Sequence, residues 1–235
     1  RSRPCWCSGW ACSRRGRRDD NSGPGLCGGR HRRLGDGHRA REHDALRFQP
    51  GIDGRGPSLQ AEPSFFAGGF EIQDEGSQLV TLLAGAKPGQ TVIDLCAGAG
   101  GKTLALAAMM EGKGRLIATD HDKRQLAPIH ERLSRAGIHN ADVRTPRGDD
   151  TLADIKASAD LVVIDAPCTG TGTWRRNPDA KWRMRPGALE VRIKDQAEVL
   201  DRAAGLVKPG GRIAYITCSV LPQENSEQVR GFTSR

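Results

Sequence analysis

No long hydrophobic run occurs in this 235-residue sequence. A membrane-spanning helix needs about 18 or more consecutive apolar residues, so the sequence predicts no membrane span. The N-terminal region is rich in arginine and lacks the apolar core of a signal peptide, which argues against secretion. Seven cysteines, an odd number spread through a long chain, argue against a disulfide framework and for a reducing compartment. We therefore expect a cytoplasmic protein without membrane contact.

Lysine and several apolar residue types are missing from the first fifth of the chain. Residues 1–50 contain 12 arginines and five acidic residues but no Lys, Ile, Val, Met or Tyr. They carry a net charge of +7, nearly the whole of the chain's +8. So few apolar side chains cannot offset the entropy lost when such a segment is ordered. We expect residues 1–50 to be a poorly organised Arg/Gly/Cys-rich segment and residues 51–235 to form the catalytic domain.

Three interpretations of residues 1–50 stay open. The segment could be a disordered basic tail that binds nucleic acid, because arginine pairs with phosphate in a bidentate manner. It could hold zinc through Cys5, Cys7, Cys12, Cys27 and His31, although this spacing lacks the paired cysteines of zinc modules. It could also be an out-of-frame reading of GC-rich DNA, which would give arginine without lysine. No metal is assigned to residues 51–235.

Strand-like and helical patterns alternate after residue 66. Apolar runs typical of strands occupy residues 91–96, 115–119, 141–145, 161–165 and 212–217. Helical patterns cover residues 102–110, 123–136 and 188–207, after a short helical stretch that ends near Gly85. This alternation predicts an α/β fold with a mostly parallel sheet and helices on both faces. Pro128 requires the helix over 123–136 to begin near Arg124 and Gln125.

A glycine-rich loop, residues 94–103, follows the first predicted strand and opens the first helix. Sheets of this kind bind nucleotide-like ligands at that position. A phosphate-binding P-loop would need glycine in place of Cys96, and the dinucleotide fingerprint would need Gly or Ala in place of Thr103. An acidic strand end followed by Gly-x-Gly instead resembles the S-adenosylmethionine loop of methyltransferases. Asp120, at the end of the second strand, could accept both ribose hydroxyls; a glycine turn without a ligand is the alternative.

Two cysteines follow two further strand ends, and this pattern indicates covalent chemistry. Cys168 and Cys218 stand in polar turns on the rim that carries the glycine loop, whereas Cys96 is better explained as a small buried side chain. The C5 carbon of cytosine becomes nucleophilic only after a thiolate adds to C6. Asp165 is placed to hydrogen-bond ring N3, where charge accumulates. Lys102 is a candidate for the positive group that ionises the thiol.

Five stretches in a fixed order, between residues 66 and 229, resemble the Sun (Fmu) family of RNA cytosine-C5 methyltransferases. The stretches are QDEGSQL, CAGAGGKT, DAPCTGTG, RRNPDAKW and TCSVLPQEN. The resemblance implies a Rossmann-like methyltransferase fold, S-adenosylmethionine as cofactor, and an RNA substrate, ribosomal RNA more than transfer RNA. It implies that Cys218 attacks C6, that Cys168 assists product release and that Asp165 orients the base. A monomer is expected.

The resemblance also implies contact residues. Those for the cofactor would be Cys96, Ala97, Gly98, Ala99, Gly100, Gly101, Lys102, Asp120, Asp165 and an acidic residue after the third strand. Asp149 suits that last position best, with Asp142 and Asp150 as rivals. An RNA-facing loop would comprise Arg175, Arg176, Asn177, Pro178, Asp179 and Lys181, unless this loop is only a solvated basic turn.

The sequence departs from the family in two respects. Residues 1–50 do not resemble the family's additional RNA-binding domain, and the two C-terminal strands that complete its sheet are missing. An exposed sheet edge would favour association. Two alternatives to the RNA methyltransferase follow. The first is an inactive RNA-binding fragment. The second is a methyltransferase acting on DNA or transfer RNA; in the DNA enzymes the Pro-Cys thiol, here Cys168, is the nucleophile.

Overall fold

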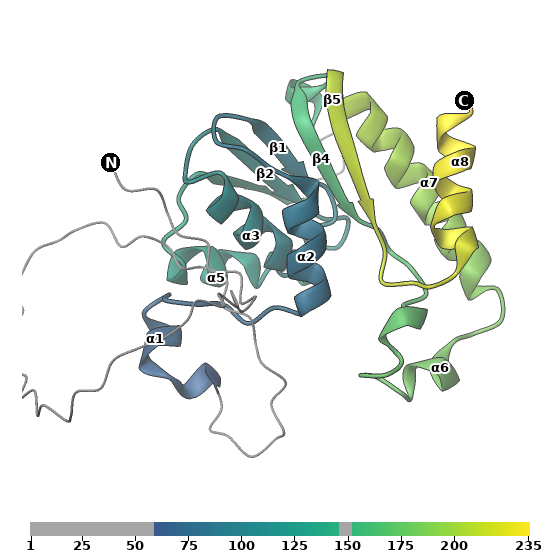
Figure 1. Cartoon of the computed structure of the whole chain (residues 1–235), viewed down its shortest axis with the longest axis horizontal. Coiled ribbons are helices and arrows are strands. Elements are labelled where there is room, and N and C mark those ends of the chain that lie inside the picture. Colours follow the sequence, from purple (N-terminus) through teal and green to yellow (C-terminus); the bar gives the residue numbers. More distant parts are fainter. Residues whose placement is uncertain (1–58, 146–151) are drawn as a thin grey trace, which may run out of the picture. The chain divides into compact units, whose positions relative to one another are not determined.

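A single parallel sheet organises the protein. The computed structural model describes residues 59–145 and 152–235. The strands lie in the order β3-β2-β1-β4-β5 and all pair in parallel, as predicted (Figure 1). Their bounds are Thr91–Asp94 (β1), Arg115–Thr119 (β2), Ala141–Arg144 (β3), Ala159–Asp165 (β4) and Val207–Ile216 (β5). The strand order changes direction between β1 and β4, which creates a crevice at their carboxyl ends.

Helices cover both faces of the sheet (Figure 1). On one face lie α2 (Glu75–Ala84), α3 (Gly101–Met109), α4 (Lys123–Leu126) and α5 (Ile129–Arg135). On the other lies α7 (Ala188–Leu206), with α8 (Ser226–Thr233) packed against it. The short helices α1 (Pro63–Phe66) and α6 (Ala180–Arg183) stand outside these layers. No helix in the part of the chain that the structure describes is long and apolar enough to cross a membrane.

Alternating residues of the central strands build two cores. Val92 of β1 and Leu161 of β4 are fully buried against α3, where they contact a cluster that includes Leu106. Their neighbours Ile93 and Val162 point to the opposite face and pack with the cluster of α7. Both faces of β1 and β4 are therefore apolar, which explains why these segments read as continuous hydrophobic runs.

Two predicted elements differ from the structure by more than two residues. The helix expected over residues 123–136 is two helices, because Pro128 lacks an N–H and instead caps α5 with a φ of −65°. The last strand begins at Val207 rather than Arg212, since Val207 already pairs with Ala159 before the register shifts. The expected helix end at Gly85 is confirmed: this glycine terminates α2 with a φ of +66°.

Candidate active site

A cavity of about 400 Å³ opens at the carboxyl ends of the central strands. Eight of the residues expected to contact a cofactor line it: Cys96, Ala97, Gly98, Ala99, Gly101, Lys102, Asp120 and Asp165. It is also lined by residues to which the sequence interpretation gave no role, among them Gln73, Asp74, Ser77, His121, Gln125 and Arg132. The cavity therefore joins the glycine loop to the segment before α2.

The glycine loop is held in place by a buried carboxylate. The backbone N–H of Gly98 donates to Asp120 Oδ2 at 2.9 Å, and the N–H of Asp122 donates to Asp120 Oδ1 at the same distance. Gly100 does not line the cavity; it is the N-cap residue before α3, with a φ of +85°, and a Cβ there would lie 2.4 Å from Cγ1 of Ile129. Asp120 thus shapes the loop and faces the cavity, whereas Gly100 permits close packing against α5.

A second carboxylate, Asp94, is completely buried beneath this loop. Thr103 Oγ1 donates to Asp94 Oδ2 at 2.7 Å, while Asp94 Oδ1 has no partner among the described residues. Burial raises the pKa of Asp94 to about 7, against the lowering effects of Thr103 and Lys102. The sequence shows that Asp94 precedes the glycine motif, but it does not show that Asp94 is buried or that its pKa is raised. Asp94 therefore behaves as a support of the loop rather than as a ligand-facing group.

Lys102 connects the glycine loop to β4. Its Nζ lies 2.7 Å from Asp165 Oδ2 and 3.4 Å from Ser77 Oγ, and the lysine is buried. The ion pair places a cation and a carboxylate together at the end of β4, next to the turn that carries Cys168. Both charges face the cavity.

Glu71, which directly precedes the cavity-lining residues before α2, is paired with two arginines of α5. Its carboxylate accepts from Arg132 at 3.2 Å and from Arg135. Arg132 also donates to the carbonyl of Ala99 at 2.9 Å. This buried pairing fixes the segment before α2 against the glycine loop. The sequence interpretation missed it, because the partners lie more than sixty residues apart.

The two cysteines of the strand-end turns meet. The Sγ atoms of Cys168 and Cys218 lie 3.3 Å apart as free thiols; Cys168 is half-buried and Cys218 exposed. A hydrogen bond from the Cys168 thiol lowers the pKa of Cys218 to about 7, although burial and Asp165 oppose this shift. The same bond and burial raise the pKa of Cys168. Of the two thiols, Cys218 is therefore the one that ionises first. Burial raises the pKa of Cys96, which stays a neutral thiol at the cavity wall.

Glu224 holds the two cysteine turns together. Its Oε1 accepts from the backbone N–H of Thr169 at 2.8 Å and from Gln196 Nε2 at 3.0 Å, and its Oε2 accepts from the Thr169 hydroxyl. Burial raises the pKa of this carboxyl, but hydrogen bonds from Ser219, Thr169 and Gln196 outweigh burial and hold it below the ordinary value. A buried, ionised glutamate therefore joins the turn of Cys168 to the segment after Cys218.

Side chains on both turns complete this connection. Thr171 Oγ1 lies 3.0 Å from Ser219 Oγ and accepts from the Val220 N–H, also at 3.0 Å. Gly172 donates its N–H to the carbonyl of Cys218 at 2.9 Å, and a Cβ at Gly172 would lie 2.8 Å from that carbonyl oxygen. The short distance between the two sulfur atoms is thus imposed by a network rather than by one contact.

The remaining predicted residues are dispersed. Asp149, Asp150, the N-terminal cysteines and His31 lie outside the described residues. Asp142 does not line the cavity; it pairs with Arg144 at 2.9 Å on the surface of β3.

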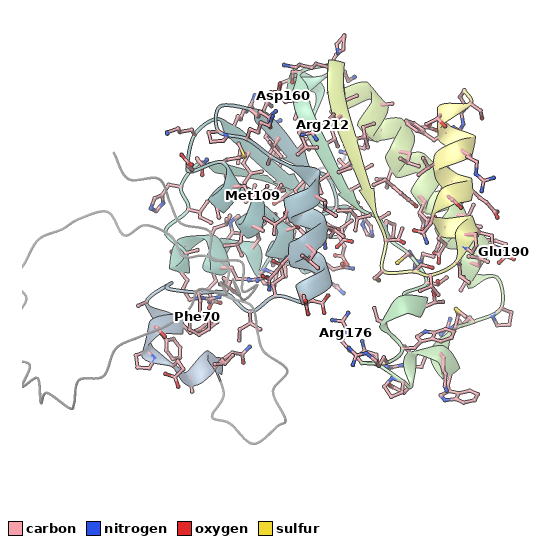
Figure 2. All side chains as sticks on the ribbon, in the orientation of Figure 1. Phe70, Met109, Asp160, Arg176, Glu190 and Arg212 are labelled. Atoms are coloured by element: carbon pink, nitrogen blue, oxygen red, sulfur yellow. The ribbon has the colours of Figure 1, made fainter. Side chains whose placement is uncertain are left out.

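In the expected RNA-facing loop, Arg176 pairs with Asp74 at the start of α2, and Figure 2 places it between α2 and the loop of α6. The other five residues are exposed at the surface: Arg175, Asn177, Pro178, Asp179 and Lys181.

Comparison with known proteins places this geometry in context. Residues 80–235 match the family model described as 16S rRNA methyltransferase RsmB/F. Ribosomal RNA small subunit methyltransferase B of Cronobacter sakazakii is 37% identical over 195 residues, which cover 82% of this chain and 43% of the relative. The probable counterpart from Synechocystis is 33% identical over 184 residues, covering 77% and 41%. The chain thus spans about two fifths of the length of the curated relatives it matches.

Among solved structures, NSun6 from Pyrococcus horikoshii, solved with SFG, is similar to this chain. The two are 30% identical with a TM-score of 0.67, over 76% of this chain and 45% of the other.

Proposed function

This chain belongs to the 16S rRNA methyltransferase RsmB/F family, and on that premise we propose that it methylates C5 of cytosine in RNA with S-adenosylmethionine as the donor. Ribosomal RNA is the expected substrate. The single observation that carries the proposal is the pair of free thiols, 3.3 Å apart, beside the cavity of the glycine loop.

The cavity suits S-adenosylmethionine. Three carboxylates, Asp74, Asp120 and Asp165, line it together with Lys102 and Arg132, and this mixed charge suits a ligand that carries a sulfonium, an ammonium and a carboxylate group. Asp120 keeps further acceptor capacity for ribose hydroxyls, above all at Oδ2, which accepts only the Gly98 N–H, whereas Oδ1 accepts from Asp122 and lies 3.1 Å from His121 Nδ1. When bound, S-adenosylmethionine supplies an electrophilic methyl group. A volume of about 400 Å³ lies within the range of cofactor pockets.

Cys218 is assigned as the nucleophile. Its lowered pKa gives a substantial thiolate fraction near neutral pH, and the thiolate forms a bond from Sγ to C6 of the ring. The electron pair of the C5–C6 double bond then shifts toward N3, so that C5 becomes nucleophilic; C5 would bond to the methyl carbon as its bond to the sulfonium sulfur breaks, and the sulfur would keep that electron pair. Asp165 is assigned to the ring N3: as a carboxylic acid it would donate its proton there as negative charge develops, and Lys102, 2.7 Å away, would offset the charge left on the carboxylate.

Cys168 is assigned to product release. Once the C5 proton has passed to a solvent base, the electron pair of that C–H bond re-forms the C5–C6 double bond, the bond from C6 to Cys218 breaks and the sulfur leaves as a thiolate. The Cys168 sulfur lies 3.3 Å from that sulfur, and a protonated Cys168 would donate to the thiolate and stabilise it as it leaves. Removing Cys168 should therefore slow release more than attack.

The test is methyl transfer from labelled S-adenosylmethionine to small-subunit ribosomal RNA, transfer RNA and DNA, with digestion to identify 5-methylcytidine. Cys218→Ala should abolish transfer, Cys168→Ala should accumulate a covalent RNA adduct, and Val220→Ala, at an exposed position in the same turn, should behave as the unmodified protein. An active Cys218→Ala protein, or an adduct that requires Cys168 and forms on DNA, would contradict the proposal. Absence of transfer to all three substrates would favour an inactive fragment.

A further inference from the structure

A second cavity, of about 320 Å³, begins at the active-site cysteine turn. Cys168 and Thr169 form one end, and the chain from α6 to the second turn of α7 forms the rest. The lining residues beyond that turn are Ala180, Arg183, Met184, Arg185, Ala188 and Arg192. We call this cavity the arginine groove. It includes none of the residues 175–179 of the loop that the sequence analysis assigned to RNA.

The arginine groove is positively charged. Three of its eight lining residues are arginines and none is acidic. Arg183 pairs with Asp179 and Arg192 with Asp195, both on exposed surfaces, whereas Arg185 has no acidic partner within the described ranges. A guanidinium group carries five N–H donors, so each paired arginine keeps donors for a further ligand. Such a surface favours a phosphate group, which arginine binds in a bidentate manner.

The arginine groove and the first cavity lie on either side of one turn. Asp165 and Pro167 line the first cavity, and Cys168 and Thr169, the next residues in the chain, line the groove. A base that reaches the two thiols occupies the point between them, so the sugar and phosphate attached to that base must extend away from the first cavity. On the side of the thiols that faces away from the first cavity, the adjoining cavity is the arginine groove.

We propose that the arginine groove binds the phosphodiester backbone of the RNA strand next to the target cytosine, with Arg185 and Arg192 as phosphate ligands. The proposal rests on the proposed function, because it takes the substrate to be RNA. The neighbouring Trp182 is 81% exposed and offers a face on which an unpaired base of the same strand can stack. This agrees with an enzyme that must take its base out of a helix before reacting.

The experiment measures binding of the full chain to a single-stranded RNA that contains the target cytosine, by fluorescence anisotropy over a series of salt concentrations. Arg185→Gln and Arg192→Gln should each weaken binding several-fold and reduce the slope of log affinity against log salt by about 0.7 for each phosphate that is no longer neutralised. Their affinity for S-adenosylmethionine, measured by calorimetry, should not change. Arg230→Gln is the matched control, since Arg230 lies on the exposed face of α8 and bonds only within its own helix.

The outcomes separate the two proposals. If the unmodified protein binds and methylates RNA but both groove variants match Arg230→Gln in affinity and slope, the groove is not the backbone site. If the unmodified protein neither binds nor methylates RNA, the proposed function fails, and the groove proposal fails with it. Groove variants that keep the circular dichroism spectrum of the unmodified protein but lose S-adenosylmethionine binding would also overturn the proposal, because these arginines would then serve the first cavity rather than the RNA backbone.

Discussion

Cys168 and Cys218 are 50 residues apart in the chain, yet their sulfur atoms lie 3.3 Å from each other. The turns that carry them follow β4 and β5, which are neighbours in the sheet. Parallel pairing brings both strand ends to the same rim, and the network around Glu224 sets the final distance. The reactivity of each thiol therefore depends on the other.

Removing Cys168 should make Cys218 a weaker nucleophile at neutral pH. The hydrogen bond from Cys168 is the largest cause of the lowered pKa of Cys218, so in Cys168→Ala this pKa should rise from about 7 toward the ordinary value of 9.0. The thiolate fraction at pH 7 would then fall by roughly tenfold or more. The measurement is the pH dependence of Cys218 alkylation by iodoacetamide, followed by mass spectrometry.

Val220→Ala serves as the control for that titration and should leave the midpoint unchanged. A midpoint near pH 7 in Cys168→Ala would mean that another group, such as Lys102, ionises Cys218.

Glu224 should contribute strongly to stability. In Glu224→Ala the Thr169 N–H, the Thr169 hydroxyl and the Gln196 amide lose a buried acceptor, at a cost of about 3 kcal/mol in the free energy of unfolding. Glu224→Gln keeps the shape of the side chain and one acceptor oxygen, so it should lower the free energy of unfolding less than Glu224→Ala does. Urea denaturation measures both, with Glu227→Ala as the control because Glu227 is exposed on the first turn of α8.

An equal loss in Glu224→Ala and Glu227→Ala would contradict this role for Glu224. A loss of stability without any change in Cys218 reactivity would show that the network supports the fold but not the thiol pair.

The sheet was predictable because its signals are local. Hydrophobic runs such as residues 161–165 alternate with helical patterns, and the glycine loop is one continuous segment whose neighbours in sequence are also neighbours in space. Pro128 shows the limit of this reasoning: a proline inside a helical pattern either falls in the first turn or ends the helix, and tertiary packing decides which.

The missed residues of the site depend on distant partners. Glu224 looks like an ordinary surface glutamate in sequence, and only its pairing with Thr169, 55 residues away, makes it a buried acceptor. Asp74 shows the capping pattern that starts a helix, but its contact with Arg176 spans 102 residues. Gly100 was expected to face the cofactor, and the structure places it against Ile129.

Asp94 should make the protein less stable as pH rises from about 4 to 7. Its folded pKa of about 7 lies above the unfolded value of 3.8, so between these values the folded state binds more protons than the unfolded state. The free energy of unfolding therefore falls as pH rises through this interval. Asp94→Asn removes the buried ionisation and keeps the side-chain shape. It should therefore be more stable than the unmodified protein at pH 8, by on the order of 4 kcal/mol, and nearly equal at pH 4.

The measurement is the free energy of unfolding in urea at several pH values. Asp201→Asn is the control, because Asp201 is exposed and its pair with Arg235 is a surface ion pair that contributes little. A parallel pH dependence in Asp94→Asn and the unmodified protein would refute the assignment.

Two glycines of the cofactor loop should respond differently to alanine. Both have positive φ, +51° at Gly98 and +85° at Gly100, so each alanine costs about 1 kcal/mol in backbone strain. A Cβ at Gly98 meets nothing within 4 Å, whereas one at Gly100 lies 2.4 Å from Ile129 Cγ1. Gly100→Ala should therefore lose a further 1 to 3 kcal/mol, roughly, through overpacking.

A double-mutant cycle with Ile129→Ala tests the cause of that difference. Truncating Ile129 removes the atoms that a Cβ at position 100 would meet, so Gly100→Ala should cost less in the Ile129→Ala background than in the unmodified protein. Gly98→Ala should cost the same in both backgrounds, because its Cβ has no such neighbour. Equal costs for Gly100→Ala in the two backgrounds would mean that φ alone requires glycine there, and that contact with α5 does not constrain the loop.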